Sequence, residues 1–549
     1  MNRRKMVVLG KSVDDEGNVV WGGIPLEDLK THALVVGTTG SGKSTLLRNL
    51  AAQTYALGAT TCIIEPHGDL CLDVMDALPE DELTNIVYLA LDGPQVPAIP
   101  LMTLGLSGGI DVGAAAAMSV IRMAEPQSWD QSTRMREVLR HSIRLLLDVQ
   151  GWQASLVALD RFLSPGEDAF RERILARATD EIARSREYCQ NELVPALMGE
   201  KGTANIQESI RAARRRLETF TNDRRLRRSL AVPPLGPRIS LAELLTGGRM
   251  VLVPVNESEI GATVAPLVSM LIMQMVKSAF LGRTDKSQRR QAVIIMDEFT
   301  KMAESEVADI VDTILREARK FGASQVLATQ SVSQLDPVTK KNVQVNTNHK
   351  IVLLVSEPDE ARDAARVLGS DQITDVDIRN MPKFHGYVRA MADKAPQPPC
   401  LLHMLPPMTL ASTGRPPPGE LSNTPPQVSD LWKRVTEMAR GLGNPLDVAA
   451  ARPLTDFLRA LPEGDWEQVV ADAQAWNRYL AARLAQHPEL EPDKVQRAKK
   501  ISRALYGLPW WLREAHYWRV RSEGKRPPGR PKQQAAPAAP EEVQAVDYG

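Results

Sequence analysis

A glycine-rich turn that ends in a lysine and a serine is the first part of this chain that could do chemistry. Residues 37–44 read GTTGSGKS and fit G-x-x-x-x-G-K-[ST] at every position. Glycines at this spacing let backbone N–H groups turn toward phosphates, the lysine reaches the β- and γ-phosphates, and the next hydroxyl binds Mg²⁺. The pattern therefore predicts a site for ATP and Mg²⁺, with Ser44 as a metal ligand and nucleotide contacts from Gly37, Thr38, Thr39, Gly40, Ser41, Gly42, Lys43, Ser44 and Thr45.

Two adjacent acids provide the second part of the predicted site. The segment QAVIIMDEF at 291–299 is an apolar run that ends in Asp297 and Glu298. A buried strand would bring Asp297 to the metal as a ligand, and Glu298 would polarise the attacking water as the catalytic base. An acidic pair that only caps a strand is the alternative, and the intact P-loop favours the catalytic interpretation.

A polar strand end provides the third part. QVLATQ at 325–330 is β-rich and ends in Gln330. Because ligands bind at the carboxyl ends of parallel strands, we expect Gln330 to lie beside the two acids. There it would act in catalysis by sensing the γ-phosphate or orienting the water. The alternative is a plain surface glutamine.

The elements that must position these residues alternate between strand and helix. An apolar run at 33–36, helical periodicity over 44–57 and a β-rich run at 60–64 form a βαβ unit. The sheet is therefore expected to be parallel and the fold class α/β. Further strands are predicted at 250–255, 292–296, 325–328 and 350–355, with a β-hairpin over 5–22 and a buried helix over 262–281.

Changes of pattern along the chain predict seven segments. They are an N-terminal β-hairpin (1–27), the first part of an ATPase core (28–104), an all-helical insertion (105–245), the second part of the core (246–404), a Pro-rich linker (405–427), a small C-terminal helical domain (428–522) and a disordered basic, Pro/Ala-rich tail (523–549). The C-terminal domain holds six of the nine tryptophans, so these are expected to form its core.

The composition is that of an ordinary globular protein. The chain carries 67 basic and 67 acidic residues, so any contact with nucleic acid must come from local patches. Its four cysteines are scattered, which favours a reducing compartment and argues against a structural metal. The basic start has no apolar run behind it, and no stretch reaches the ~20 apolar residues of a membrane span. We therefore expect a cytoplasmic protein without membrane insertion.

Taken in order, these motifs resemble the FtsK/HerA superfamily of DNA-pumping ATPases. Within it, the chain looks like the coupling proteins of conjugation and type IV secretion, of the TraG/TraD type. The resemblance rests on IPLEDLKTHALVVGTTGSGKST, EPHGDL, IIMDEF, REARKFG and LATQSVSQL, and it covers roughly residues 20–400. It implies a RecA-like core with a helical insertion, assembled as a homohexameric ring around DNA.

The resemblance also assigns a role to one arginine. Arg319 in REARKFG corresponds to the arginine that reaches the ATP of the neighbouring subunit, and it is favoured over Arg316 on the same predicted helix. Two features depart from the family. The second motif begins with Glu65 instead of aspartate, so a role for this acid is not carried over. The membrane helices usual in coupling proteins have no counterpart here, so membrane docking is not implied.

Clusters of arginine mark candidate DNA contacts. Residues 201–230 hold nine basic residues against three acids, and a solvated helix face is the alternative for such a run. The family context favours sequence-independent contact with DNA through Arg211, Arg214, Arg215 and Arg216. In the tail, GRPK resembles the core of a minor-groove arm and places Arg530 as a further candidate, although a plain basic tail is the commoner explanation.

The function predicted from these residues is an ATP-driven DNA translocase. An assembly ATPase or ATP-dependent switch that remodels proteins is the alternative. A metabolic P-loop kinase is disfavoured because such enzymes are usually shorter and lack the Asp-Glu pair with a distant strand-end glutamine. A relaxase, a nuclease or a secretion-channel protein are the partner classes left open.

Overall fold

The computed structural model describes residues 5–14, 16–91, 93–236, 241–261, 264–281, 290–302, 305–392, 395–418, 421–445 and 447–523. The chain divides into two compact units. The first, here named the sheet unit, contains Met1–Leu89, Ser240–Leu421 and Arg483–Ser502. The second, the helical unit, contains Ala90–Ile239, Ser422–Ala482 and Arg503–Gly549.

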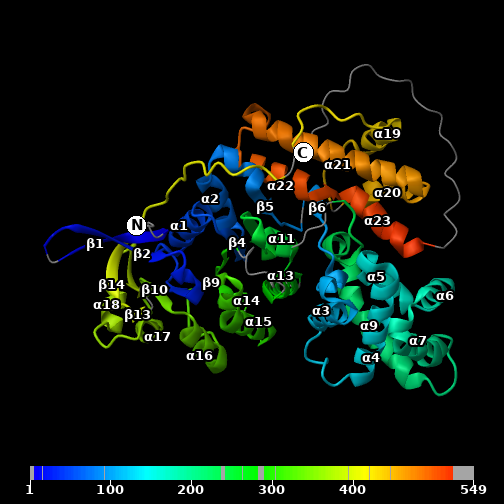
Figure 1. Cartoon of the computed structure of the whole chain (residues 1–549), viewed down its shortest axis with the longest axis horizontal. Helices are drawn as coiled ribbons and strands as arrows, with labels where there is room; N and C mark the ends of the chain where they lie inside the picture. Colours follow the sequence, from blue (N-terminus) through cyan, green and yellow to red (C-terminus); the bar gives the residue numbers. More distant parts are fainter. Residues whose placement is uncertain are drawn as a thin grey trace. The chain divides into compact units, whose positions relative to one another are not determined.

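An 11-stranded sheet forms the middle of the sheet unit (Figure 1). Seven neighbouring strands run parallel in the order β10-β3-β9-β8-β4-β7-β5. Their bounds are Ala33–Val36 (β3), Thr60–Glu65 (β4), Ile86–Tyr88 (β5), Met250–Pro254 (β7), Ala292–Met296 (β8), Ala323–Thr329 (β9) and His349–Leu353 (β10). The predicted α/β fold class with a parallel sheet is thereby confirmed.

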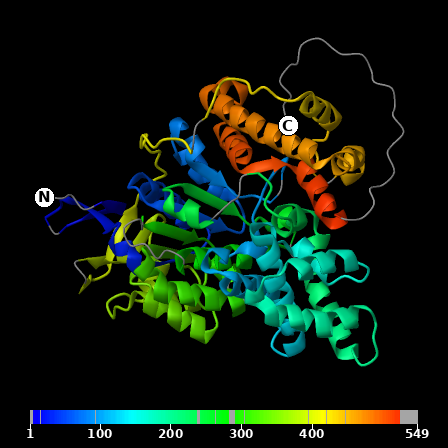
Figure 2. The same ribbon diagram turned by 45° about the vertical axis from the view of Figure 1, so that its right-hand side comes forward.

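The parallel strands are buried along their whole length because helices cover both faces of the sheet. Helices α1 (Lys43–Ala56) and α2 (Asp69–Ala77) lie on one face. The other face carries α13 (Val264–Leu281), α15 (Ser305–Glu317) and α16 (Pro337–Asn346), as Figures 1 and 2 show. The apolar stretch predicted as a buried helix is thus α13. No helix in the described part of the chain combines the length and the apolar character that crossing a membrane requires.

Four antiparallel strands extend the sheet beyond β10. They are β11 (His385–Arg389), β14 (Cys400–Met404), β1 (Met6–Val13) and β2 (Val19–Pro25). The predicted N-terminal hairpin exists, but β1 pairs with β14, so the hairpin continues the main sheet. Strands β11 and β14 were not predicted from the sequence, because their alternating or exposed residues give no continuous apolar run.

The helical unit has two groups of helices. From the first part of the chain come α3 (Ile110–Arg122), α4 (Thr133–Gln150), α5 (Leu156–Phe162), α6 (Asp168–Arg177) and α9 (Ala204–Asn222). From the last part come α19 (Asp430–Ala439), α20 (Val448–Arg459), most of α21 (Glu463–Gln486), and α23 (Trp510–Ser522). Four tryptophans expected in a core are buried together, namely Trp432, Trp466, Trp510 and Trp511.

The boundaries of the two compact units differ from the predicted domain boundaries. Residues 90–104 fall in the helical unit, and residues 483–502 fall in the sheet unit. The described part of the proline-rich stretch 405–427 contains no helix or strand. Apart from Glu523, the predicted tail, including Arg530, lies outside the described residues.

Candidate nucleotide site

The glycine-rich turn joins β3 to α1 in a conformation that needs its glycines. Gly40 and Gly42 have positive φ angles of 78° and 102°, which other residues rarely adopt. A Cβ atom on Gly37 would lie 2.7 Å from Ser41 Oγ and 2.9 Å from Leu353 Cβ, closer than packed atoms approach. Few residue types other than glycine could therefore occupy these positions in the turn.

Polar groups of the turn suit a polyphosphate. Helix α1 begins at Lys43, and the first N–H groups of a helix have no acceptor within it. Ser41 is buried, yet its Oγ has no hydrogen-bond partner among the described residues. Thr38 Oγ1 instead donates to the carbonyl of Leu354 over 2.9 Å. The helix terminus, the lysine and the unpaired hydroxyl together fit an anionic ligand.

Strand β8 delivers the two acids to the carboxyl edge of the sheet. Asp297 and Glu298 follow the strand directly, and both are buried. Glu298 has a φ of 48°, in the left-handed region, and its N–H donates to Asp297 Oδ1 over 2.9 Å. Such a conformation costs about 1–3 kcal/mol and is common where a side chain must be aimed at a reaction site.

Lys43 and the acids meet across the sheet edge. The Nζ atom of Lys43 lies 3.1 Å from Asp297 Oδ1 and also donates to Glu298 Oε1. In the sheet, β9 lies between the P-loop strand β3 and the acid strand β8. This order explains how residues 254 or more positions apart in sequence can touch.

Gln330 completes a continuous network of hydrogen bonds. Its Nε2 donates to Glu298 Oε1 over 2.7 Å, and its Oε1 accepts from Thr39 Oγ1 over 3.1 Å. The network therefore runs from the P-loop through Gln330 to Glu298 and back to Lys43. Ser44 and Thr45 follow Lys43 in the first turn of α1, and the Asp297 carboxylate lies against the ammonium of Lys43, so the two residues predicted to bind Mg²⁺ are both neighbours of this lysine.

One buried acid beside the site was given no role from the sequence. Glu65 is the last residue of β4. The preceding residue, Ile64, is paired with Met296 of β8, so Glu65 lies next to Asp297. Both carboxylate oxygens accept from the N–H of Leu70 over 3.1 Å, at the start of α2. Burial raises the pKa of Glu65 to about 8, and the negative charge of Asp297 acts in the same direction.

Arg319 does not join this group. It lies in a short 3₁₀ turn, Ala318–Phe321, directly before β9, and its side chain is exposed. Gln330 directly follows the other end of that 7-residue strand, which at about 3.3 Å per residue puts the two residues roughly 20 Å apart. Arg316 pairs with Asp312 on α15. Arg319 therefore cannot reach a nucleotide in its own P-loop.

Four of the five arginines predicted to contact DNA lie on α9 in the helical unit, and three of these four have protein partners. Arg214 Nε lies 3.2 Å from Asp160 Oδ1, and Arg215 forms two hydrogen bonds of 2.8 Å with Glu125. The Arg216 residue is only 1% exposed.

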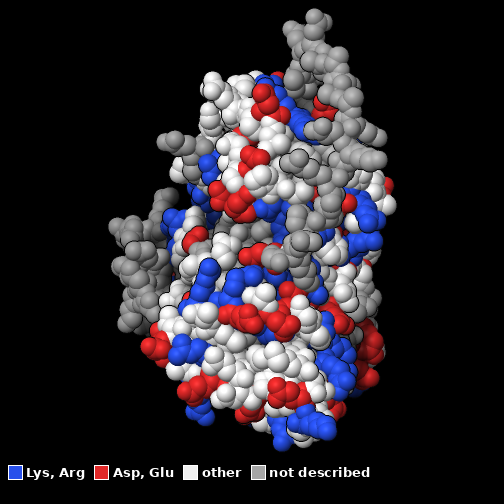
Figure 3. All heavy atoms as spheres, turned by 90° about the vertical axis from the view of Figure 1, so that its right-hand side faces the viewer, with Lys and Arg blue, Asp and Glu red and all other residues white. Residues whose placement is uncertain are grey.

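Burial decides which of these arginines can meet a ligand. Arg216 lies over the ring of Trp129, 5.9 Å from its centroid, and pairs with Glu125, so the expectation that it contacts DNA is at odds with its position. A run of charge in the sequence does not show which residues face the neighbouring helices, and α9 packs on α3 and α4. Arg211 is exposed, and no ion pair holds it among the described residues. On the face shown in Figure 3, basic and acidic side chains are interspersed.

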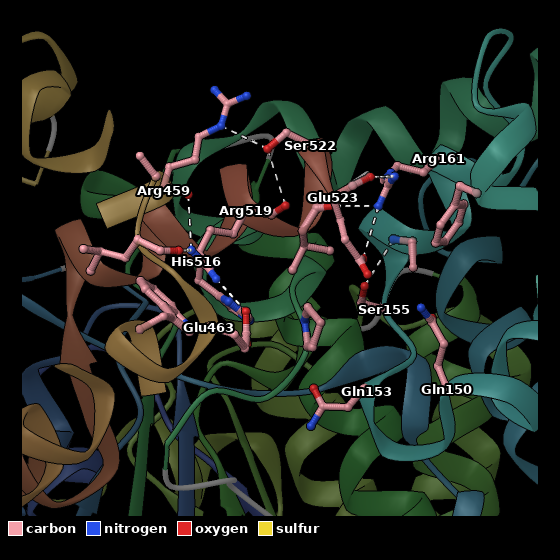
Figure 4. A pocket seen from close by; sticks show the side chains of 17 residues that line it. Gln150, Gln153, Ser155, Arg161, Arg459, Glu463, His516, Arg519, Ser522 and Glu523 are labelled. Carbon is pink, nitrogen blue, oxygen red and sulfur yellow. Dashed lines mark hydrogen bonds and ion pairs between the residues drawn. The ribbon is translucent and has the colours of Figure 1, made fainter. Parts of the chain in front are cut away.

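A cavity of about 560 Å³ in the helical unit is distinct from the nucleotide site (Figure 4). Its arginines already have partners: Arg519 lies 2.6 Å from Glu463, Arg459 donates to Ser522 over 2.9 Å, and Arg161 donates to a backbone carbonyl over 2.7 Å. No predicted site residue lines it. A phosphate there would have to compete with contacts already made.

Comparison with known proteins gives two family matches. Residues 153–380 match the model described as the type IV secretion-system coupling protein DNA-binding domain. Residues 7–91 match the model described as the central domain of helicase HerA. No curated protein sequence matches the chain.

Several solved structures resemble the chain at low identity. The unbound bacterial conjugative coupling protein TrwBdeltaN70 is 16% identical, with 76% of this chain and 92% of that chain covered and a TM-score of 0.48. VirB4 of Thermoanaerobacter pseudethanolicus is 15% identical, with 75% and 98% covered and a TM-score of 0.47. Plasmid TrwB in complex with the ATP analogue ADPNP is 17% identical, with 72% and 89% covered and a TM-score of 0.45.

The two family matches lie in separate stretches that include the P-loop strand, the acid pair and Gln330. They confirm the resemblance of this chain to FtsK/HerA-type P-loop ATPases and, among them, to the coupling proteins of type IV secretion.

Proposed function

We propose that this chain hydrolyses Mg-ATP and uses the free energy to move DNA. The observation that carries the proposal is the network that links Thr39, Gln330, Glu298 and Lys43 at one edge of the parallel sheet. It joins a phosphate-binding loop to an acid and to an amide that can position a water molecule. The match to a coupling-protein DNA-binding domain supports DNA as the track.

In this proposal the P-loop binds the triphosphate of ATP. Backbone N–H groups at the start of α1, the hydroxyl of Ser41 and the ammonium of Lys43 hold the phosphates. Ser44 and Asp297 would hold Mg²⁺, which would neutralise charge on the phosphates. Lys43 already pairs with two carboxylates, so phosphate oxygens compete with Glu298 for the same ammonium.

Glu298 then acts as the base. Once Lys43 pairs with phosphate, the Glu298 carboxylate is free to accept a proton from water, while Gln330 keeps it in place. The water oxygen attacks the γ-phosphorus, the bond to the bridging oxygen of ADP breaks, and Glu298 takes the proton. Gln330 is therefore a positioning residue that acts through Glu298.

We also propose that the active form is a homohexameric ring in which Arg319 acts on the neighbour's ATP. Its separation from Gln330 along β9 supports this assignment, because an exposed arginine at the amino edge of the sheet is available to another subunit. An arginine supplied in trans stabilises charge that develops on the transferring phosphoryl group.

For DNA, we propose a contact surface on helices α3, α4 and α9 of the helical unit. Arg140 on α4 and Arg211 on α9 are exposed, and neither forms an ion pair with a described residue. Arg136 and Arg140 line a hollow of about 380 Å³ together with Trp129. Arg136 and Arg140 were not predicted from the sequence as DNA contacts; their spacing of four residues on one helix was the available signal.

The experiment measures ATPase activity and DNA binding over a range of salt. DNA of any sequence is expected to raise the ATPase rate, and the rise is expected to fade as salt increases. Changing Arg140 and Arg211 together to Ala should flatten the salt slope of binding by up to about two. Arg362→Ala, an exposed arginine on α17 (Pro358–Leu368) of the sheet unit, is the matched control.

A second candidate function is ATP-dependent remodelling of proteins. The pairing of Arg214 and Arg215 with acids favours it, since these arginines offer less free charge to DNA than the sequence suggests. If single- and double-stranded DNA leave both the ATPase rate and the protein's electrophoretic mobility unchanged at low salt, this second function replaces the DNA motor.

A further inference from the structure

Phe384 is a large aromatic residue in an unusual position. It directly precedes β11, its side chain and backbone are 52% exposed, and its φ is 62°. A bulky residue in the left-handed region is rare, and such strain is concentrated at functional sites. Burial in a core does not account for this residue, because half of it faces solvent.

The ring of Phe384 lies against the P-loop. A Cβ atom built on Gly42 would be 3.1 Å from Cδ1 and 3.8 Å from Cε1 of that ring. Gly42 immediately precedes Lys43 and the first turn of α1. The ring therefore stands beside the loop and the helix start to which the nucleotide site has been assigned.

The surrounding backbone holds Phe384 in this conformation. The carbonyl of Phe384 accepts from the N–H of Met404 over 2.8 Å, and the N–H of His385 donates to Pro382 over 3.2 Å. The rings of His385 and His403 stack with their centroids 4.7 Å apart. Contacts on both β11 and β14 thus fix the backbone of Phe384, which directs its ring toward Gly42.

Sheet topology puts Phe384 on one particular side of the P-loop. The strand order is β11-β10-β3-β9-β8, so Phe384 and Glu298 adjoin strands on opposite sides of β3. Because β11 runs antiparallel to β10, its first residue lies at the carboxyl edge of the parallel strands. A triphosphate whose γ end faces Glu298 extends its nucleoside away from β8, toward β11.

We propose that Phe384 is the stacking platform for the nucleobase of the bound nucleotide. This proposal rests on the ATP site proposed above and adds the contact that binds its base. A phenyl face offers stacking area and no hydrogen-bond pattern, so it accepts any purine. ATP and GTP are therefore expected to bind with similar affinity through this contact, and pyrimidine triphosphates more weakly.

Calorimetric titration with ATP, GTP, CTP and inorganic tripolyphosphate tests the platform. Phe384→Ala is expected to weaken ATP and GTP binding about tenfold and to leave tripolyphosphate binding unchanged. Phe384→Tyr keeps the ring and is expected to bind ATP as the parent does. Val376→Ala removes another exposed apolar side chain of the sheet unit and is the matched control.

The outcomes separate this proposal from the ATP site itself. If Phe384→Ala binds ATP and tripolyphosphate with the parental affinities, while Lys43→Met loses both, the platform is wrong and the site stands. If the parent binds neither ATP nor tripolyphosphate, the site itself is wrong. If Phe384→Ala weakens ATP and tripolyphosphate equally, the ring supports the loop and not the base. Phe384→Gly removes the strained side chain, so an unchanged melting temperature with weakened ATP binding would exclude a merely structural role.

Discussion

Gln330 holds the carboxylate of Glu298 through a hydrogen bond of 2.7 Å from Nε2 to Oε1. The same amide accepts from Thr39 in the P-loop over 3.1 Å, so one side chain connects the phosphate-binding turn to the acid. Glu298 also accepts a hydrogen bond from the ammonium of Lys43, and its backbone has a strained φ of 48°. Each of these contacts leads to a separate prediction.

Glu298→Gln is expected to keep ATP binding and to lower kcat by about 10²–10⁴. The amide fills the same space but cannot take the proton of the attacking water. Steady-state phosphate release and equilibrium binding of ATP measure the two effects. A variant that hydrolyses ATP at the parental rate would show that another group is the base.

Gln330→Ala is expected to lower kcat about a hundredfold with little change in ATP affinity. Gln330→Glu places a second carboxylate beside Glu298 and opposes its ionisation, so the acidic limb of the kcat profile is expected to move to higher pH by about one unit. The pH dependence of kcat is the readout that a merely structural role would not move. An unchanged profile in Gln330→Glu would remove Gln330 from the mechanism.

Lys43→Met is expected to abolish ATP binding and to destabilise the sheet unit by about 3 kcal/mol, because it leaves two buried carboxylates without a cation. Adding Glu298→Gln should recover part of the stability without restoring ATP binding. Chemical denaturation and nucleotide titration of both single variants and the double variant give the cycle. If the change in the free energy of unfolding of the double variant equals the sum of the changes in the two single variants, Lys43 and Glu298 are not coupled.

Arg319→Ala is expected to bind ATP normally and to lower kcat about a thousandfold in the proposed ring. Mixing it with Lys43→Met subunits should restore part of the activity, because each subunit supplies what the other's interface lacks. Activity is measured across mixing ratios, with mass determination in the presence of ATP. A monomer at every concentration, together with no rescue at any ratio, contradicts the action in trans.

The buried side chain of Lys350 is expected to make the free energy of unfolding depend on pH. It is buried on β10, and burial lowers its pKa from 10.5 to about 7, with the positive charge of Arg389 acting in the same direction. Between these values the unfolded chain holds a proton that the folded chain has lost, so stability rises with pH by about 1.4 kcal/mol per unit. Lys350→Met should flatten this rise in denaturation curves between pH 7 and 10. A slope that persists unchanged would show that Lys350 is not its source.

The parts of the candidate site with a local signal could be predicted from the amino-acid sequence. The P-loop pattern and the run that ends in Asp297 each lie within ten residues, and their apolar strands are continuous because a parallel sheet covered on both faces has no polar side. For the same reason six of the seven parallel strands could be placed from sequence, whereas the three-residue β5 and the antiparallel strands β11 and β14 could not.

Which distant residues meet, and which way their side chains face, depends on how the whole chain folds. The order β3-β9-β8 brings Gln330 between Thr39 and Glu298, and strand length keeps Arg319 at the opposite edge. The burial of Arg216 follows from how α9 packs on α3 and α4, which a run of arginines does not reveal. Phe384 carries no motif, and its contact with Gly42 exists because β11 pairs with β10. Pairing between strands distant in sequence depends on the whole sheet, so it cannot be predicted from the residues of a single strand.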